Sequence, residues 1–356
     1  MSNALNRIKQ RVRELRAYAL KPERAGIKLN QNENPWDVPP EIRKETLRRL
    51  DERRWSRYPD FTPQSLRKSL AEFAGWTPDG IIVGNGSNEL IQALLMVTVG
   101  PLTPVLINEP TFALYRQITT ILSGEVVSVP LTAKLTYDTK AMRAAIQSEA
   151  PGVAIICSPN NPTGCVIETQ DLVSLLESCP GLLVIDEAYH EFAGQTVVPL
   201  LNKYPNLVVL RTFSKAMALA GLRLGYLLAA PELTGEIAKA VLPYNLNIVS
   251  QTAAQVAIEM YQSRLKPLVT LICAQRERLF REIEQIQGLK PVPSRANFML
   301  VRSEISPSRM FYELLQRDIL VRDVSSYPML HDYFRVSVGT PEENDRLLEA
   351  LREIFD

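Results

Sequence analysis

The chain has 356 residues, of which 46% are hydrophobic, and this length predicts two domains with a large buried core. Its formal net charge of +1 creates no overall field that would recruit nucleic acid or an anionic membrane, so we expect neither partner. The four cysteines show no C-x-x-C spacing and only two histidines are present, which predicts no metal site and no disulfide framework and fits a reducing compartment, the cytoplasm.

Short apolar runs alternate with helix-length segments up to about residue 242. The expected buried strands span residues 81–83, 105–107, 126–129, 153–157, 182–185, 207–210 and 226–228. Most of them are separated by helical segments, such as residues 89–99 and 171–177. This pattern is typical of an α/β domain whose mostly parallel sheet is flanked by helices. Neither the charged amino terminus, residues 1–16, nor the apolar segment 217–230, which Arg223 interrupts, predicts a signal peptide or a membrane span.

The pattern changes at about Pro243. A long helical stretch, a further apolar segment, a helix, short strands and a closing helix are expected at residues 249–286, 291–302, 309–316, around Ile319 and Phe334, and at 341–355. This order indicates a smaller α+β domain. We therefore place the large domain at residues 25–242 and form the small domain from residues 1–24 together with residues 243–356.

Polar segments follow the predicted strands, and ligands of such sheets bind at the carboxyl ends of the strands. The segment Gly84–Glu89 combines glycines with the start of a helix, whose unpaired N–H groups suit a phosphate. Phe112 follows the second strand and is placed to stack on an aromatic ring. Asn161 lies in a proline-glycine turn after Cys157, where its side chain would hydrogen-bond a phenolate oxygen.

A carboxylate and an amine follow two further strands. Asp186 ends an otherwise apolar strand, where a buried carboxylate requires a cationic partner such as a protonated pyridine nitrogen, and Tyr189 would reach the phenolic oxygen of that ring. Lys215 lies between Ser214 and Arg223, so an amine stands beside a site for a phosphate-sized anion. This arrangement suits a covalent link to pyridoxal phosphate, in which the cofactor supplies the electron sink.

Each of these features alone also has an ordinary structural explanation. Lys215 is compatible with a solvated surface lysine, and the segment Gly84–Glu89 with a capped turn. Asn161 is compatible with a structural turn, Asp186 with a helix cap or an ion pair, and Phe112 with core packing. The features point to one site only as a set, because all of them follow predicted strands in a fixed order.

As a set, the motifs resemble the fold-type I aminotransferases, and over nearly the whole chain they resemble the histidinol-phosphate aminotransferase family within that group. The motifs that carry this resemblance are LNQNENP (29–35), RYPD (57–60), GNGS (84–87), SPNNPTG (158–164), DEAY (186–189), RTFSK (211–215), AGLR (220–223) and FRVSVGT (334–340). The resemblance implies a fold-type I pyridoxal-phosphate transferase, with a mixed, mostly parallel seven-stranded sheet in the large cofactor-binding domain. It also implies a homodimer with shared active sites.

The resemblance implies a role for each matching residue. Lys215 would carry the cofactor and then move a proton between Cα and C4′, while Asp186 would pair with the pyridine nitrogen. The residues that would contact the rest of the cofactor are Tyr189 and Asn161 at O3′, Phe112 on the ring face, and Ser87, Asn88, Ser214 and Arg223 at the phosphate, joined by Tyr58 from the neighbouring subunit. The catalytic residues would be Lys215, Asp186 and Tyr189.

The substrate side of the site also matches the family. Arg322 and Arg335 would bind the anionic groups of the substrates, because the forked guanidinium suits both phosphate and carboxylate. Tyr18, Asn161 and Tyr58 would border the substrate beside these arginines.

The implied reaction is reversible amino transfer between L-histidinol phosphate and 2-oxoglutarate, which gives imidazole acetol phosphate and L-glutamate in histidine biosynthesis. An aromatic amino acid aminotransferase and a threonine phosphate decarboxylase are alternatives on the same scaffold. A non-catalytic regulatory protein that binds the cofactor is a third alternative, against which the joint presence of Lys215, Asp186 and Arg223 argues.

Overall fold

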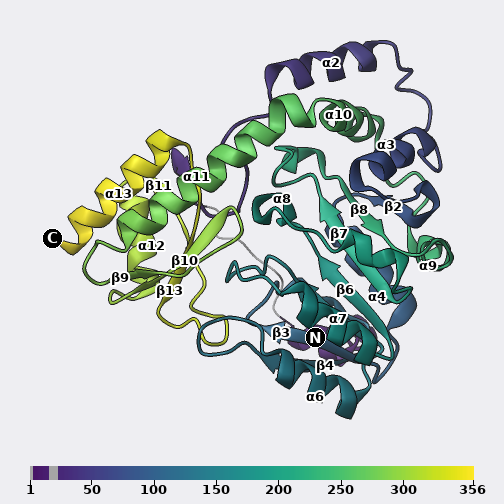
Figure 1. Ribbon diagram of the computed structural model, residues 1–356, viewed down its shortest axis with the longest axis horizontal. Coiled ribbons are helices and arrows are strands. Elements are labelled where there is room, and N and C mark those ends of the chain that lie inside the picture. Colours follow the sequence, from purple (N-terminus) through teal and green to yellow (C-terminus); the bar gives the residue numbers. More distant parts are fainter. Residues whose placement is uncertain (1–2, 16–22) are drawn as a thin grey trace.

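Two sheets organise the protein, a large one within residues 81–228 and a small one within residues 289–337 (Figure 1). The computed structural model describes residues 3–15 and 23–356, so Tyr18 lies outside the described residues. The carboxyl-terminal elements gather at one end of the molecule, on the left of Figure 1, and the large sheet with its helices occupies the other end. The domain bounds at residues 24/25 and 242/243 stay a prediction.

The large sheet has seven strands, and a single one of them, β8, runs against the others. In order across the sheet they are β2 (Ile81–Gly84), β8 (Gly225–Leu228), β7 (Leu207–Thr212), β6 (Leu182–Asp186), β5 (Val153–Cys157), β3 (Pro104–Glu109) and β4 (Glu125–Pro130). Each predicted strand lies within one of these observed strands. The predicted mixed, mostly parallel sheet is therefore confirmed.

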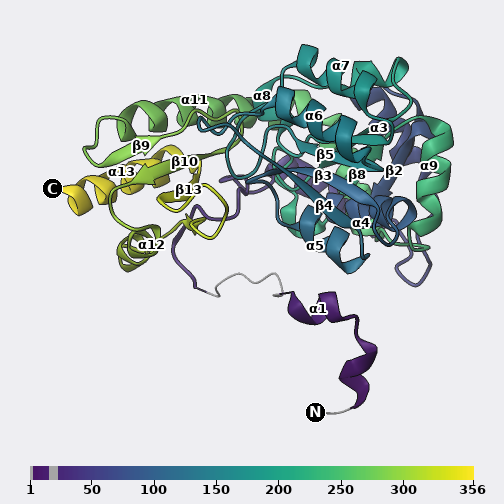
Figure 2. The same cartoon turned by 90° about the horizontal axis from the view of Figure 1, so that it is seen from below.

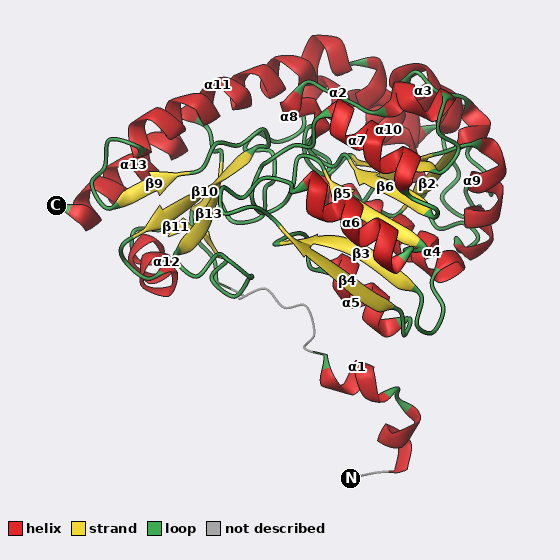
Figure 3. Ribbon diagram, turned by 60° about the horizontal axis from the view of Figure 1, so that its bottom comes forward, coloured by secondary structure: helices red, strands yellow, loops and turns green. Residues whose placement is uncertain are grey.

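Helices cover both faces of this sheet (Figure 3). The α-helices of this part of the chain are α2 (Pro40–Asp51), α3 (Gln64–Ala74), α4 (Ser87–Thr98), α5 (Leu114–Ile121), α6 (Thr139–Glu149), α7 (Thr169–Ser178), α8 (His190–Ala193), α9 (Pro231–Ile237) and α10 (Ile248–Glu259). The core on one face includes residues of α3, α6, α7 and α10, and the core on the other face includes residues of α4, α5 and α9.

Strand β5 shows why the strands read as continuous apolar runs. Its residues Ala154 and Ile156 pack into one core, and Val153, Ile155 and Cys157 pack into the core on the opposite face. Successive side chains of a strand point to opposite faces, so a strand covered by helices on both sides must be apolar at every position. Only the residues after the strand's end are then free to be polar.

The small sheet is antiparallel and is covered by the last three helices. Its strands and helices are β12 (Arg322–Asp323), β13 (Tyr333–Ser337), β10 (Phe298–Ser303), β9 (Leu289–Pro291), α11 (Lys266–Ile283), α12 (Pro307–Gln316) and α13 (Pro341–Phe355). Helix α13 has the predicted bounds because Thr340 and Glu343 form a capping box at its start. This arrangement confirms the predicted small α+β fold.

The predicted helix over residues 249–286 is interrupted. A π-helical turn, η6 (Tyr261–Leu265), separates α10 from α11. Pro267 lies in the first turn of α11, where its ring excludes a regular α-helical continuation from the preceding turn. The π-helical turn therefore separates α10, which belongs to the end with the large sheet, from α11, which belongs to the end with the small sheet.

A short parallel pair joins distant parts of the chain. Strand β1 (Ile27–Lys28) pairs with β11 (Ile319–Leu320), and Leu29 packs into the core of the small domain. The remaining short helical turns are η1 (Asn3–Arg7), η2 (Pro78–Gly80), η3 (Val198–Asn202), η4 (Ala220–Leu222) and η5 (Ala238–Ala240). Helix α1 (Gln10–Glu14) lies outside both sheets near α5, where Lys9 Nζ donates to the carbonyl of Ile121 at 3.0 Å (Figure 2). Within residues 3–15 and 23–356, every helix is too short or too polar to cross a bilayer.

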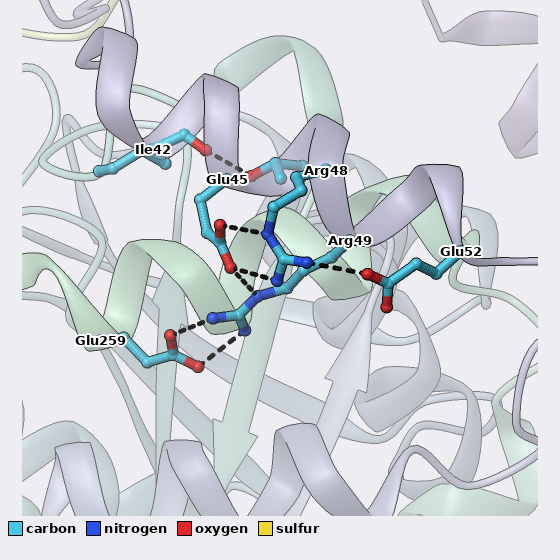
Figure 4. A network of polar contacts seen from close by, with 7 residues as sticks. Ile42, Glu45, Arg48, Arg49, Glu52 and Glu259 are labelled. Atoms are coloured by element: carbon cyan, nitrogen blue, oxygen red, sulfur yellow. Dashed lines mark hydrogen bonds and ion pairs between the residues drawn. The ribbon is translucent and has the colours of Figure 1, made fainter.

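A network of ion pairs fastens α2 to α10 on the surface (Figure 4). Arg49 donates to both carboxylate oxygens of Glu259 at 2.9 and 2.6 Å and to Glu45 at 2.8 Å, and Arg48 bridges Glu45 and Glu52. The hydrogen bonds from Arg48 and Arg49 lower the pKa of Glu45 to about 2. This network lies away from the cavity described below.

Candidate active site

One cavity of about 380 Å³ collects most of the predicted site residues at the carboxyl ends of the parallel strands. Those that line it are Ser87, Asn88, Phe112, Asn161, Asp186, Tyr189, Ser214, Lys215, Arg223, Arg322 and Arg335. Residues 30–33 and the small-domain residues Val324 and Tyr327 line it as well. The cavity therefore lies between the large sheet and the small domain.

One end of the cavity is shaped for a small anion. Ser87 is the first residue of α4, and Arg223 Nη1 donates to Ser214 Oγ at 3.1 Å. Gly86 has a φ of +83°, and a Cβ there would lie 2.6 Å from Arg223 Nη2. A Cβ on Gly225 would lie 2.4 Å from the backbone nitrogen of Ser87. The two glycines thus allow hydroxyls, helix N–H groups and a guanidinium to crowd around one point.

Asp186 is a buried carboxylate at the floor of the cavity. Burial raises the pKa of Asp186 to about 6, against the hydrogen bonds that favour its charged form. Those bonds come from Tyr115 Oη at 2.7 Å and from the backbone nitrogen of Ala188 at 3.1 Å. A cationic ring nitrogen placed against Asp186 would supply the partner that a buried charge requires.

Lys215 directs its amine into the cavity. Burial is the largest cause that lowers the pKa of Lys215 to about 7, and the positive charge of Arg335 adds to the shift. The Lys215 Nζ donates to the backbone carbonyl of Gln31 at 2.9 Å and lies 5.9 Å from the centre of the Tyr189 ring. An amine with this pKa is partly neutral near pH 7, as a nucleophile or a proton acceptor must be.

The two arginines face the cavity from neighbouring strands of the small sheet. Arg322 of β12 pairs with Arg335 of β13 in the antiparallel register, which puts both side chains on the same face. Arg335 donates to Asn161 Oδ1 at 2.5 Å and to the backbone carbonyl of Asn30 at 2.7 Å. The side chain of Arg335 is therefore held at the junction of both domains.

One of the predicted site residues that the structure describes does not line this cavity. Tyr58 is 81% exposed and stacks on Tyr244 with ring centres 4.6 Å apart. Tyr18 lies outside the described residues. The roles of both residues stay predictions.

Among the site residues that sequence reasoning missed, two contact a predicted site residue through their side chains. Tyr115 is fully buried and bonds Asp186, and Asn32 bonds the hydroxyl of Tyr189. Asn32 belongs to the motif at residues 29–35, which carried the family resemblance without a role for this residue. Tyr115 lies in the first turn of α5, and only its contact with Asp186 across 71 positions of sequence shows its use.

Known proteins match the chain over most of its length. The family model described as aminotransferase class I and II matches residues 24–351. The curated histidinol-phosphate aminotransferase of Chlorobium phaeovibrioides is 38% identical over 345 residues, 96% of this chain and 95% of that protein. The one of Caldanaerobacter subterraneus subsp. tengcongensis is 36% identical over 351 residues, 98% of this chain and 99% of that protein.

A solved structure matches as well. The crystal structure of histidinol-phosphate aminotransferase from Sinorhizobium meliloti, in complex with pyridoxal-5'-phosphate, superposes with a TM-score of 0.88 at 25% identity. The match covers 98% of this chain and 97% of that chain.

Proposed function

The chain belongs to the histidinol-phosphate aminotransferase family, within aminotransferase class I and II, and we propose that it transfers the amino group between L-histidinol phosphate and 2-oxoglutarate. The products of this step of histidine biosynthesis are imidazole acetol phosphate and L-glutamate. The family predicted from the sequence motifs is thereby confirmed, as are the enzyme class and the cofactor, pyridoxal phosphate.

The residues of the cavity fit this cofactor. Gly86 and Gly225 let Arg223 and the start of α4 at Ser87 come close together, and a side chain at either glycine would collide with them. Asp186 offers a buried carboxylate to a ring nitrogen, and Phe112 lines the same cavity. When bound, pyridoxal phosphate supplies the electron sink for the reaction.

The proposed cofactor contacts follow from these positions. Ser87, Asn88, Ser214 and Arg223 would hold the phosphate, and Phe112 would stack on the ring. Asp186 would keep the ring nitrogen protonated, because a buried carboxylate stabilises the positive charge beside it. Asn161 and Tyr189 would bind the phenolic oxygen.

Lys215 is the proposed proton carrier. Its pKa of about 7 lets its Nζ accept a proton from the substrate carbon and return it without a large energetic cost at either step. The carbonyl of Gln31 accepts from this Nζ and keeps the amine in the cavity while it is free. Proton transfer would therefore take place within the cavity.

The two arginines carry the proposed substrate choice. Arg322 and Arg335 are cationic forks that share one face of the small sheet beside Lys215, and this is the single observation that best supports a donor with a phosphate group. The same forks suit the carboxylates of 2-oxoglutarate in the other half-reaction. Asn161 and Tyr18 are proposed to border the substrate beside them.

We also propose a homodimer whose subunits share active sites. Tyr58, Phe61 and Tyr244 form an exposed aromatic patch, because Tyr244 contacts both other rings and the three side chains are between 43% and 81% exposed. Apolar patches of this kind mark protein interfaces. Tyr58 would reach the cofactor phosphate and the substrate of the neighbouring subunit, and the enzyme would work in the cytoplasm on small molecules.

The shared site is tested by mixing subunits. In a mixed dimer of Tyr58→Ala and Lys215→Ala subunits, one site has both Lys215 and Tyr58 of the partner subunit intact, so activity should return to about half that of the wild type. Lys215→Ala alone should be inactive and Tyr58→Ala alone impaired. A mixed dimer no more active than its parents would place Tyr58 outside the neighbouring site.

An amino-donor panel tests the substrate. Histidinol phosphate should exceed phenylalanine, tyrosine and aspartate in kcat/KM with 2-oxoglutarate as acceptor, and histidinol without the phosphate should be a poor donor. If phenylalanine or tyrosine is the better donor, the protein is an aromatic amino acid aminotransferase. If no donor is used although pyridoxal phosphate binds, the protein is a non-catalytic binder.

A further inference from the structure

Three consecutive residues, Asn30 to Asn32, each contact a different side chain of the proposed site. The carbonyl of Asn30 accepts from Arg335 at 2.7 Å, and the carbonyl of Gln31 accepts from Lys215 at 2.9 Å. Asn32 contacts Tyr189 through its side chain, with Nδ2 donating to the Tyr189 Oη at 3.0 Å. We call residues 30–32 the strap.

The strap is held by the small domain. Asn32 is 1% exposed and has a φ of 54°, a left-handed conformation that asparagine tolerates better than most residues. Its backbone nitrogen donates to Ser337 Oγ at 2.9 Å, and its carbonyl accepts from Asn297 Nδ2 at 3.1 Å. The backbone of Asn32 is therefore fixed on both sides before its side chain reaches Tyr189.

The orientation of the Asn32 amide follows from the same contacts. Ser337 Oγ accepts the backbone N–H of Asn32, so its own hydrogen is available to the Asn32 Oδ1 at 3.2 Å. With Oδ1 engaged by Ser337, the amide group directs its N–H toward Tyr189. A phenol oxygen that accepts in this direction must turn its own hydrogen to the other side.

We propose that Asn32 is a positioning residue that sets the direction in which the Tyr189 hydroxyl donates, so that this hydrogen points into the cavity toward the phenolic oxygen of the cofactor. The inference rests on the proposed function, because it assumes the contact between Tyr189 and that oxygen. It goes beyond that function because it attributes the direction in which the Tyr189 hydroxyl donates to Asn32, a residue held by the small domain.

Within the described chain, the hydrogen bond from Asn32 fixes one side of the Tyr189 hydroxyl. The charged and titratable groups that face it are Arg335 from the small domain and Asp186, Cys157 and Lys215 from the large domain. Burial raises the pKa of Tyr189, so its hydroxyl stays protonated and able to donate near neutral pH. The hydrogen of Tyr189 is thus always present, and only its direction needs to be set.

Asn32→Asp is the sharpest test, because aspartate has nearly the same shape and tolerates the same backbone conformation. A carboxylate only accepts, so the Tyr189 hydroxyl should turn toward residue 32 and away from the cofactor. In the holoenzyme, affinity for pyridoxal phosphate should fall by roughly ten-fold. The pH midpoint of the cofactor's visible absorbance should rise by about half a unit or more, because the negative oxygen loses its donor.

A double-mutant cycle with Tyr189→Phe separates this effect from the added charge. In the Tyr189→Phe background, Asn32→Asp should change affinity by less than about three-fold, since no hydroxyl remains to be turned. Equal changes in both backgrounds would overturn the inference and leave the role of Tyr189 in place. If Tyr189→Phe alone changes neither affinity nor midpoint, the proposed contact of Tyr189 fails and the inference fails with it.

Asn32→Gly keeps the test decisive if the aspartate variant does not fold. Glycine adopts the positive φ without strain and removes the side-chain donor. The loss of affinity should be smaller than for aspartate, but it should again depend on Tyr189. A loss that is the same in the Tyr189→Phe background would show that Asn32 acts on the backbone alone and would overturn the inference.

Discussion

The two walls of the cavity differ in how far apart their contacting residues lie in the sequence. On the wall made by the large sheet, Ser214 and Arg223 touch across nine positions, and Tyr115 and Asp186 touch across 71. On the wall made by the strap and the small domain, Asn30 and Arg335 touch across 305 positions, and so do Asn32 and Ser337. The first wall is built from strand ends and the turns that follow them, whereas the second is completed only when both ends of the chain have met.

Substitutions in the two walls should therefore have different effects on the enzyme. The sheet wall holds the amine, the buried carboxylate and the proposed phosphate site, so its substitutions should affect the chemical step and cofactor binding. The other wall holds the arginines and orients groups of the first, so its substitutions should mainly affect substrate choice and geometry.

Lys215→Ala should lower kcat by roughly 10⁴ or more, because both the covalent link to the cofactor and the proton carrier are lost. Borohydride reduction of the wild-type holoenzyme followed by peptide mapping should find the label on Lys215. A label on another lysine would show that Lys215 does not form the covalent link and would remove it from the chemical step.

Asp186→Asn should lower kcat by about 10², because the cavity loses the charge that favours a protonated ring nitrogen while the shape is kept. Single-turnover rates measure this directly. Tyr115→Phe is the matched control: it leaves the carboxylate but removes a hydrogen bond to its charged form, which should shift the acidic limb of the pH profile to higher pH with a smaller loss of rate. An unchanged single-turnover rate in Asp186→Asn would make this carboxylate structural.

Arg335→Lys should lower kcat/KM for histidinol phosphate by roughly ten-fold, because lysine keeps the charge and loses the fork. The exposed Arg302 of β10 in the same domain provides the control, and Arg302→Lys should leave kcat/KM unchanged. Equal kinetics for the two variants would remove Arg335 from the substrate site.

The buried amine predicts a pH-dependent stability of the cofactor-free protein. The pKa of Lys215 is about 7 in the folded chain against 10.5 for an ordinary lysine, so between these values the unfolded chain binds more protons and stability rises with pH. The free energy of unfolding, compared with that of Lys215→Met, should rise by up to about 1.4 kcal/mol per pH unit in this window. Denaturant titrations from pH 7 to pH 9 test it, and a constant difference would mean that Lys215 is protonated throughout.

Arg49→Met should destabilise the protein by less than about 1 kcal/mol, because its partly exposed ion pairs across α2 and α10 are screened by solvent. The difference from the wild type should shrink at high salt, and kcat/KM should stay unchanged. A loss of activity here would show that the two walls depend on contacts far outside the cavity.

Features with a local signal in the sequence could be predicted without the structure. Apolar runs predict all seven strands of the large sheet because strands covered on both faces are apolar at every position. The polar residues after those runs predict the cavity, because parallel strands bring their carboxyl ends to one edge. Helix α13 has its predicted bounds, and the residues that form its start, Thr340, Pro341 and Glu343, lie close together in the sequence.

Only the tertiary structure decided the contacts that join segments with no local signal for each other. The bond from Tyr115 to Asp186 needs α5 to pack beneath the end of β6, and the bond from Asn32 to Tyr189 needs the strap to be anchored on Ser337. The break at Tyr261–Leu265 likewise appears only in the fold, since one proline in a long apolar pattern does not show which turn will distort. In each case, partners far apart in sequence are chosen by burial and hydrogen-bond satisfaction, and those depend on the whole fold.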